Sequence, residues 1–213
     1  MERVRALGPF ARRPTDEFES EMRPPMPVCT DTVPAPPAAA PQRIVLPGGA
    51  EALVREIQPE DAPALQRFHS GLSARSVYMR FFELLPRLSD DRAAYFTQLD
   101  GADRHALVAL DPAHPDEILG VVRYDRELGS DTAEYAAILA DAWQGRGLGM
   151  AMTRRLIEDA RARGIRRLYA LTLPENAAML TLFRALKLPM TINWDGQGLR
   201  VDLDISAART DRR

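Results

Sequence analysis

The chain has 213 residues, of which 46% are apolar and 27% are charged, and this ordinary globular composition excludes a disordered chain or a collagen-like fibre. A formal net charge of −2 at pH 7 argues against a general coat for DNA or RNA. The sequence contains no run of about 18 apolar residues, so we expect no membrane span.

Two further features of the composition bear on the cellular compartment. Residues 1–15 lack the continuous apolar stretch of a secretory signal, and Cys29 is the only cysteine, which excludes an internal disulfide. We therefore expect a cytoplasmic protein. Of the 28 basic residues, only Lys187 is a lysine. A GC-rich bacterial genome explains this bias, and resistance to lysine modification is the functional alternative.

Prolines crowd the amino-terminal part of the chain, where nine of the 17 fall within residues 1–41. Proline removes backbone donors and disfavours helix in the residue before it. A segment of this composition does not bury enough apolar surface to offset its ordering entropy. We therefore expect a flexible arm over 1–42, either a dispensable tail or a partner-binding arm, followed by one domain over 43–207 and a frayed end over 208–213.

Hydrophobic periodicity and turn residues divide the remainder into alternating elements. In chain order, the pattern predicts a strand over 53–57, helices over 59–69, 74–84 and 90–99, strands over 105–110, 118–124 and 132–140, a helix over 150–163, a strand over 167–173, a helix over 175–186, and strands over 191–193 and 199–204. Ser73 and Ser89 are predicted N-caps, and Gly164 is expected to end the fourth helix. Three consecutive strands predict an antiparallel meander within a mixed α/β sheet.

The segment 141–150, DAWQGRGLGM, joins a predicted strand to the most clearly amphipathic helix. Its three alternate glycines let the backbone turn tightly and expose successive N–H groups, which together with the positive end of the helix suit a pyrophosphate. A P-loop is excluded because its Lys and Ser/Thr are missing, and a dinucleotide fingerprint fails because the sixth position from Gly145 is Met150. A cluster of turn glycines without a ligand is the alternative.

The order Q-G-x-G-x-G between a strand and a helix resembles the coenzyme A loop of the GNAT superfamily of N-acetyltransferases. Other segments resemble, in the same order, the GNAT domain of bacterial protein-lysine acetyltransferases. These segments are residues 72–82 with Leu88 and Ser89, 120–124, 133–136 and 174–179. The resemblance spans roughly residues 50–205. It implies an α/β fold with a mixed, mostly antiparallel sheet of about six to seven strands and helices on both faces.

The resemblance also implies acetyl-CoA as the cosubstrate and assigns Glu134 as the catalytic base, acting directly or through water. The strand pattern is compatible with this role, because Glu134 shares one face with Ala136 and Ile138. Small or apolar neighbours leave room for an acetyl group and raise a carboxylate pKa by desolvation. An ordinary charged residue on a half-exposed strand is the alternative.

In the superfamily, the end of this strand splays away from its neighbour and the cofactor inserts beside it. The contacts that the resemblance implies for the cofactor are Ile138, Leu139, Ala140, Gln144, Gly145, Arg146, Gly147, Leu148, Gly149, Met150 and Asn176. Arg146, Arg154 or Arg155 is expected to reach the 3′-phosphate, although a solvated helix face explains Arg154 and Arg155 equally well. Asn176 also suits a helix cap. No metal is expected.

The chain departs from the superfamily at one position. Many members carry a Tyr seven residues after this Asn, which protonates the leaving thiolate, and here that position is Phe183. Because Phe has no proton to donate, water or the substrate ammonium must supply it. His105 and His114 are not placed to substitute.

The leading hypothesis is an N-acetyltransferase that acts on protein lysines by direct attack in a ternary complex, since no nucleophile for a covalent intermediate is evident. Its expected partners are acetyl-CoA and a protein with a lysine, and neither a nucleic acid nor a membrane. The oligomeric state is left open. The alternatives are an acetyltransferase for a small amine and a non-catalytic regulator that binds acyl-CoA.

Overall fold

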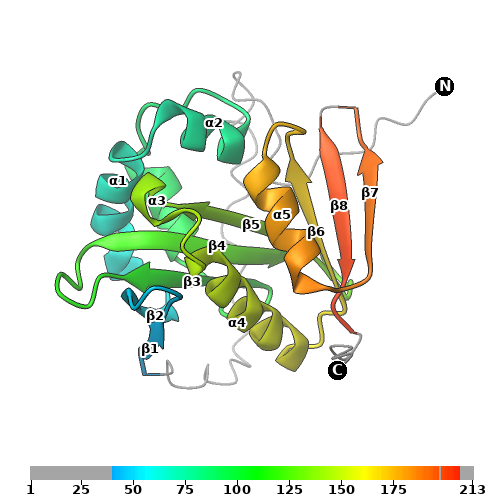
Figure 1. Ribbon diagram of the computed structural model, residues 1–213, viewed down its shortest axis with the longest axis horizontal. Coiled ribbons are helices and arrows are strands. Elements are labelled where there is room, and N and C mark those ends of the chain that lie inside the picture. Colours follow the sequence, from blue (N-terminus) through cyan, green and yellow to red (C-terminus); the bar gives the residue numbers. More distant parts are fainter. Residues whose placement is uncertain (1–39, 197, 207–213) are drawn as a thin grey trace, which may run out of the picture. The chain divides into compact units, whose positions relative to one another are not determined.

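The computed structural model describes residues 40–196 and 198–206 (Figure 1). Apart from residues 40–42, the predicted arm over 1–42 lies outside the described residues, and so does the predicted frayed end over 208–213. None of the described helices is long and apolar enough to cross a membrane.

One mixed sheet of eight strands forms the centre of the described part, in the order β1-β2-β3-β4-β5-β6-β8-β7. The strands are β1 (Gln42–Val45), β2 (Glu51–Glu56), β3 (Arg104–Leu110), β4 (Ile118–Arg126), β5 (Thr132–Leu139), β6 (Arg167–Thr172), β7 (Met190–Trp194) and β8 (Leu199–Asp204). Only β5 and β6 run parallel, and the predicted meander β3-β4-β5 is confirmed. The sheet therefore has slightly more strands than the six to seven expected.

β1 is the strand that the sequence pattern did not reveal. Three of its four residues are exposed, so the alternation of apolar and polar residues has too little length in which to show. The signal that existed is the turn that follows it. Gly48 and Gly49 take φ of 94° and 84°, and the Leu46 amide donates to the Ala50 carbonyl at 2.7 Å. A Gly-Gly pair between two short runs is a hairpin signal.

Five α-helices are described around this sheet, together with two short 3-10 turns. They are α1 (Ala62–Ser70), α2 (Ala74–Phe81), α3 (Asp90–Thr97), α4 (Leu148–Ala162), α5 (Ala177–Leu186), η1 (Pro59–Asp61) and η2 (Asp141–Trp143). Ser73 and Ser89 cap α2 and α3 as predicted, accepting hydrogen bonds from the amides of Ser76 and Arg92. α2 ends earlier than predicted, because Phe82 adopts a left-handed conformation with φ of 58°.

Helices cover both faces of the sheet, as expected. α4 and α5 lie in front of it in Figure 1 and enclose the main core. The largest fully buried side chains of this core include Tyr124, Tyr135, Phe183, Leu148, Met152 and Leu156. α1, α2 and α3 pack on the opposite face, where α1 contacts β4 and α2 contacts β5. Because side chains alternate along a strand, Tyr135 points into the main core and Glu134 points toward α1–α3.

Candidate active site

β5 and β6 separate to form a V-shaped opening in the sheet, called the V below. Their parallel pairing covers only Thr132–Glu134 of β5, which then continues to Leu139 beside β4 alone. The Ala140 amide donates to the β4 side at 2.9 Å. Since peptide groups alternate in direction along a strand, those of Ala137 and Leu139 face the V. The V therefore offers an extended ligand a strand edge that no other strand occupies.

The glycine-rich segment lies at the wide end of the V. Gly145 and Gly147 take φ of 72° and 91°, conformations that other residues rarely adopt. Among the described residues, the amides of 145–150 donate to no backbone carbonyl. Those in the first turn of α4 have no partner inside the helix, and the positive end of the helix dipole lies at the same place. This is the geometry of an anion site.

Side chains of the same segment connect it to α2. The Asp141 carboxylate accepts hydrogen bonds from the Ser73 amide at 2.8 Å, the Ser73 hydroxyl at 2.8 Å and the Ser76 hydroxyl at 2.6 Å. The Gln144 amide group donates to Ser76 Oγ at 3.0 Å and to the Leu139 carbonyl at 3.2 Å. Partial burial acts to raise the pKa of Asp141, but these hydrogen bonds outweigh it and the pKa lies below its usual value.

Glu134 occupies the narrow end of the V and is only 5% exposed. Burial raises its pKa to about 7. The neighbouring charges act in both directions, because Arg80 and Arg123 lower the pKa and Asp125 raises it. Asp125 lies directly opposite Glu134 in the β4–β5 register, and Arg104 and Arg123 hold it in ion pairs at 3.0 and 3.1 Å. A carboxylate with a pKa near neutrality is suited to exchanging protons at physiological pH.

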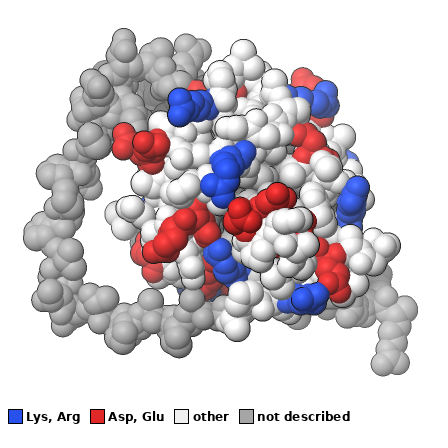
Figure 2. Space-filling view, turned by 90° about the vertical axis from the view of Figure 1, so that its left-hand side faces the viewer, with Lys and Arg blue, Asp and Glu red and all other residues white. Residues whose placement is uncertain are grey.

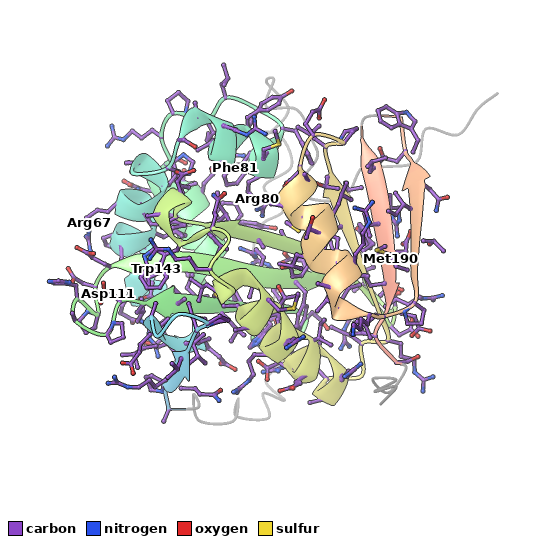
Figure 3. The ribbon with its side chains drawn as sticks, viewed as in Figure 1. Arg67, Arg80, Phe81, Asp111, Trp143 and Met190 are labelled. Carbon is purple, nitrogen blue, oxygen red and sulfur yellow. The ribbon has the colours of Figure 1, made fainter. Side chains whose placement is uncertain are left out.

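A pocket opens on the α1–α3 face of the sheet, and its nearest lining residue along β5, Ala136, is two residues from Glu134. Figure 3 shows Arg80 and Phe81 at the end of α2, and both line the pocket together with Ala136 and Ile138 of β5. The rest of the lining is apolar apart from His69 and Arg123. Desolvation lowers the pKa of Arg80 to about 10. The pocket contains no carboxylate in its lining.

The acetyltransferase (GNAT) domain family matches residues 52–188. The chain belongs to the GNAT acetyltransferase family. A curated acetyltransferase of Pseudomonas aeruginosa is 31% identical over 144 residues, which is 66% of this chain and 76% of that protein. Among solved structures, the GNAT domain of PAT from S. lividans matches with a TM-score of 0.72 and 35% identity, over 77% of this chain and 96% of that chain.

A cAMP-binding acyltransferase from Mycobacterium smegmatis shares the fold at a TM-score of 0.57 and 22% identity, over 82% of this chain and 50% of that chain. The predicted resemblance and the predicted fold class are thus confirmed. The protein is an acetyl-CoA-dependent N-acetyltransferase. The predicted site residues of this GNAT domain lie in the meander, along the V, in the glycine loop and at the start of α5.

The remaining residues predicted for the cofactor of this acetyltransferase lie around the V. Asn176 caps α5, with its Oδ1 accepting from the Met179 amide at 3.1 Å, so the cap alternative holds. The Arg146 guanidinium lies 5.6 Å from the Trp143 ring centroid. Arg155 is bound to Asp159 at 3.1 Å and to Gln42 at 2.7 Å, which ties α4 to β1.

Phe183 lies on α5 and is buried, with its ring edge-on to Tyr135 at 5.5 Å between centroids. His105 is buried away from the V and contacts Asp159 of α4 at 3.2 Å. Neither residue brings a hydroxyl or an imidazole to Glu134, as the sequence led us to expect. What the sequence did not reveal is the environment of Glu134, because that environment depends on which residues of β4, β6 and α2 are brought beside it.

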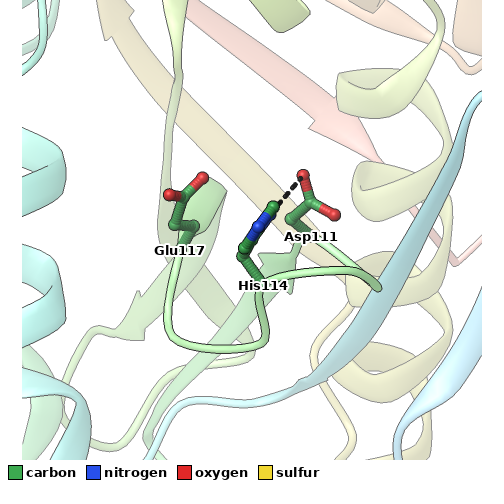
Figure 4. A group of neighbouring side chains, drawn as sticks. All are labelled: Asp111, His114 and Glu117. Atoms are coloured by element: carbon green, nitrogen blue, oxygen red, sulfur yellow. Dashed lines mark ion pairs between the residues drawn. The ribbon is translucent and has the colours of Figure 1, made fainter.

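Asp111, His114 and Glu117 gather in the turn between β3 and β4 (Figure 4). Their ligand atoms all lie within 4.8 Å of one another, and His114 Nδ1 is 4.0 Å from Asp111 Oδ2. His114 and Glu117 are exposed, and the other oxygen of Asp111 accepts from the Ala113 amide at 2.7 Å.

On the described part of the side shown in Figure 2, acidic and basic side chains are interspersed rather than gathered into one basic surface.

Proposed function

We propose that this acetyltransferase transfers the acetyl group of acetyl-CoA to lysine side chains of proteins. The observation that carries the proposal is the buried Glu134 at the narrow end of the V, with a pKa of about 7. The structural similarity to the GNAT domain of PAT from S. lividans, at 35% identity, supports the same branch of the family.

The form of the V and of the glycine loop supports binding of acetyl-CoA at this place. The amides of 145–150 and the N-terminus of α4 suit the diphosphate, and the exposed edge of β5 suits the amide-bearing pantetheine arm. From Leu139 to Glu134 the strand rises about 17 Å, so an arm anchored at the loop carries its thioester toward Glu134. Ile138, Leu139, Ala140, Gln144 and Asn176 are therefore proposed to flank the bound cosubstrate.

The chemistry requires removal of a proton from the acceptor. A lysine ammonium has a pKa of about 10.4, so neutralising it at pH 7 costs roughly 4.6 kcal/mol. Ionised Glu134 accepts this proton, directly or through a water molecule. The amine nitrogen then forms a bond to the thioester carbon, the carbon–sulfur bond breaks, and its electron pair leaves with the sulfur.

The departing thiolate must then gain a proton. Phe183 has none to give, and it lies in the core beside Tyr135. This role is left to water or to the second proton of the substrate ammonium, which the attacking nitrogen releases as it becomes an amide. A thiol with a pKa of about 8.5 is a good leaving group near neutral pH even without a dedicated acid. The departure at Phe183 therefore alters the acid step and leaves the rest of the mechanism intact.

The charges around the pocket favour a protein acceptor over a small cationic amine. A small polyamine or aminoglycoside would require a pocket rich in carboxylates, whereas this pocket is apolar and contains Arg80 and Arg123. Helices α1–α3 cover Glu134 on one face of the sheet. Beyond β6, the strands β8 and β7 carry many half-exposed and exposed side chains. An acceptor lysine on a protein surface is proposed to reach Glu134 from the side of β8 and β7.

The test measures release of CoA from acetyl-CoA with candidate acceptor proteins and with small amines, using wild type and Glu134→Gln. The proposal predicts turnover on protein lysines, located by mass spectrometry, and a loss of about 10²–10⁴-fold in the variant. Turnover on small amines alone would favour the small-molecule alternative. Binding of acetyl-CoA without turnover on any acceptor, in both proteins, would favour the regulator.

A further inference from the structure

Tyr169 of β6 faces Glu134 across the narrow end of the V. The two residues form the last register pair between β5 and β6 before the strands separate, and both are buried. The Tyr169 hydroxyl donates to Glu134 Oε2 at 3.4 Å. The bond is long, as catalytic hydrogen bonds often are before a substrate binds. Of the residues on β6, Tyr169 is thus the one placed to act on the Glu134 carboxylate.

A second layer of contacts holds the Tyr169 ring in place. The Arg200 guanidinium of β8 lies 3.7 Å from the ring centroid, and Arg200 is bound to Asp202 at 2.9 Å. Asp202 is also the register partner of Tyr169 on β8. A phenol stacked by a cation and packed within a sheet has little freedom to rotate, so its hydroxyl stays beside Glu134.

We propose that Tyr169 positions the Glu134 carboxylate for proton removal, by holding Oε2 through its phenol so that Oε1 is presented to the acceptor amine. The inference rests on the proposed role of Glu134 as the base. Tyr169 is a positioning residue, because it acts on the substrate only through Glu134. Its role would supply the fixed geometry that efficient proton transfer requires.

The charges around Glu134 make the effect of the phenol measurable. Burial raises the pKa of Glu134, and the hydrogen bond from Tyr169 lowers it, because a bond to the ionised carboxylate favours that form. Loss of the hydroxyl is therefore expected to raise the pKa further. The other charged groups around this pair are Arg80 of α2, Asp125 and Arg123 of β4, Glu127 after β4, which faces the Tyr169 hydroxyl, and Arg200 of β8.

The experiment compares wild type, Tyr169→Phe and the matched control Tyr124→Phe in the full chain. Tyr124 is also a buried tyrosine, but its hydroxyl donates to the Ala102 carbonyl and not to Glu134. The rate is measured against pH at saturating acetyl-CoA, and the KM for acetyl-CoA is measured by varying its concentration. We expect Tyr169→Phe to lower kcat at least about tenfold, the fold-change of one lost hydrogen bond to a charged group. Its acidic limb should move to higher pH with an unchanged KM for acetyl-CoA, and Tyr124→Phe should match wild type.

A second substitution keeps the test decisive if Tyr169→Phe does not fold. Incorporation of 3-fluorotyrosine at position 169 preserves the ring and makes the phenol a stronger donor, so the acidic limb should move to lower pH. An acidic limb and kcat that stay at wild-type values in both Tyr169 variants would overturn the inference. A Glu134→Gln variant with the wild-type rate would instead refute the proposed base itself, so the two failures are distinguishable.

Discussion

Glu134 is predicted to cost the protein stability, and replacing it should show this. Burial raises its pKa from 4.5 to about 7, so ionising it in the folded protein costs about 3 kcal/mol more than in the unfolded chain. Glu134→Gln removes the charge while keeping the shape. We expect the variant to be roughly 1–3 kcal/mol more stable than wild type at pH 8, or about 3–10 °C higher in Tm, while losing its activity.

The size of this effect depends on pH, because the pKa of Glu134 differs between the folded and unfolded states. Because the pKa of Glu134 is higher in the folded than in the unfolded state, the protonated form favours folding and the ionised form opposes it. The contribution of the protonated form to the stability of wild type is fully present below about pH 4.5 and is lost as the pH rises through about 7. Thermal melts followed by circular dichroism should therefore show a small difference at pH 5 and a larger one at pH 8. Glu158→Gln, which removes an exposed carboxylate of α4, is the matched control and should show neither. A Glu134→Gln variant that melts below wild type at pH 8, or whose advantage does not change with pH, would refute this reasoning.

Three further predictions follow from the same site. Gly147→Val should weaken acetyl-CoA binding in calorimetry, because φ of 91° disfavours a side chain there and the new Cβ would lie 3.1 Å from Pro47; unchanged affinity would count against the loop as the binding site. Asp141→Ala should destabilise the start of α2 by about 1 kcal/mol, because the carboxylate accepts hydrogen bonds from Ser73 and Ser76. Hydrogen exchange of the α2 amides should become faster, and an unchanged exchange rate would contradict this prediction. The acidic limb of kcat/KM for the acceptor should report a group near pH 7 and vanish in Glu134→Gln, and its persistence there would assign it to another residue.

Much of this fold was predictable because its signals are local. The meander is marked by short strands with Asp/Gly turns, and the caps Ser73 and Ser89 and the stop at Gly164 each lie next to the element they bound. The glycine loop was equally visible, because its unusual backbone needs three closely spaced glycines. β1 was not visible, since four largely exposed residues leave little periodicity to read.

The environment of the site was less predictable, because it depends on contacts between distant parts of the chain. Asp141 reaches Ser73 across 68 residues, and no local pattern announces such a bond. Tyr169 meets Glu134 only because β6 pairs parallel to β5 in one register and then diverges. A shift of that register by one residue would turn Tyr169 to the other face of the sheet. The raised pKa of Glu134 follows from these contacts and not from its position in the sequence.

We propose that the diphosphate of acetyl-CoA binds to the amides of 145–150 and that its thioester lies beside Glu134. A crystal structure of the complex with acetyl-CoA tests this most directly. We predict hydrogen bonds from these amides to the diphosphate, the pantetheine arm alongside β5 within the V, and the thioester next to the Glu134 carboxylate. Acetyl-CoA bound at another surface, with the V closed by its own strands, would contradict the account.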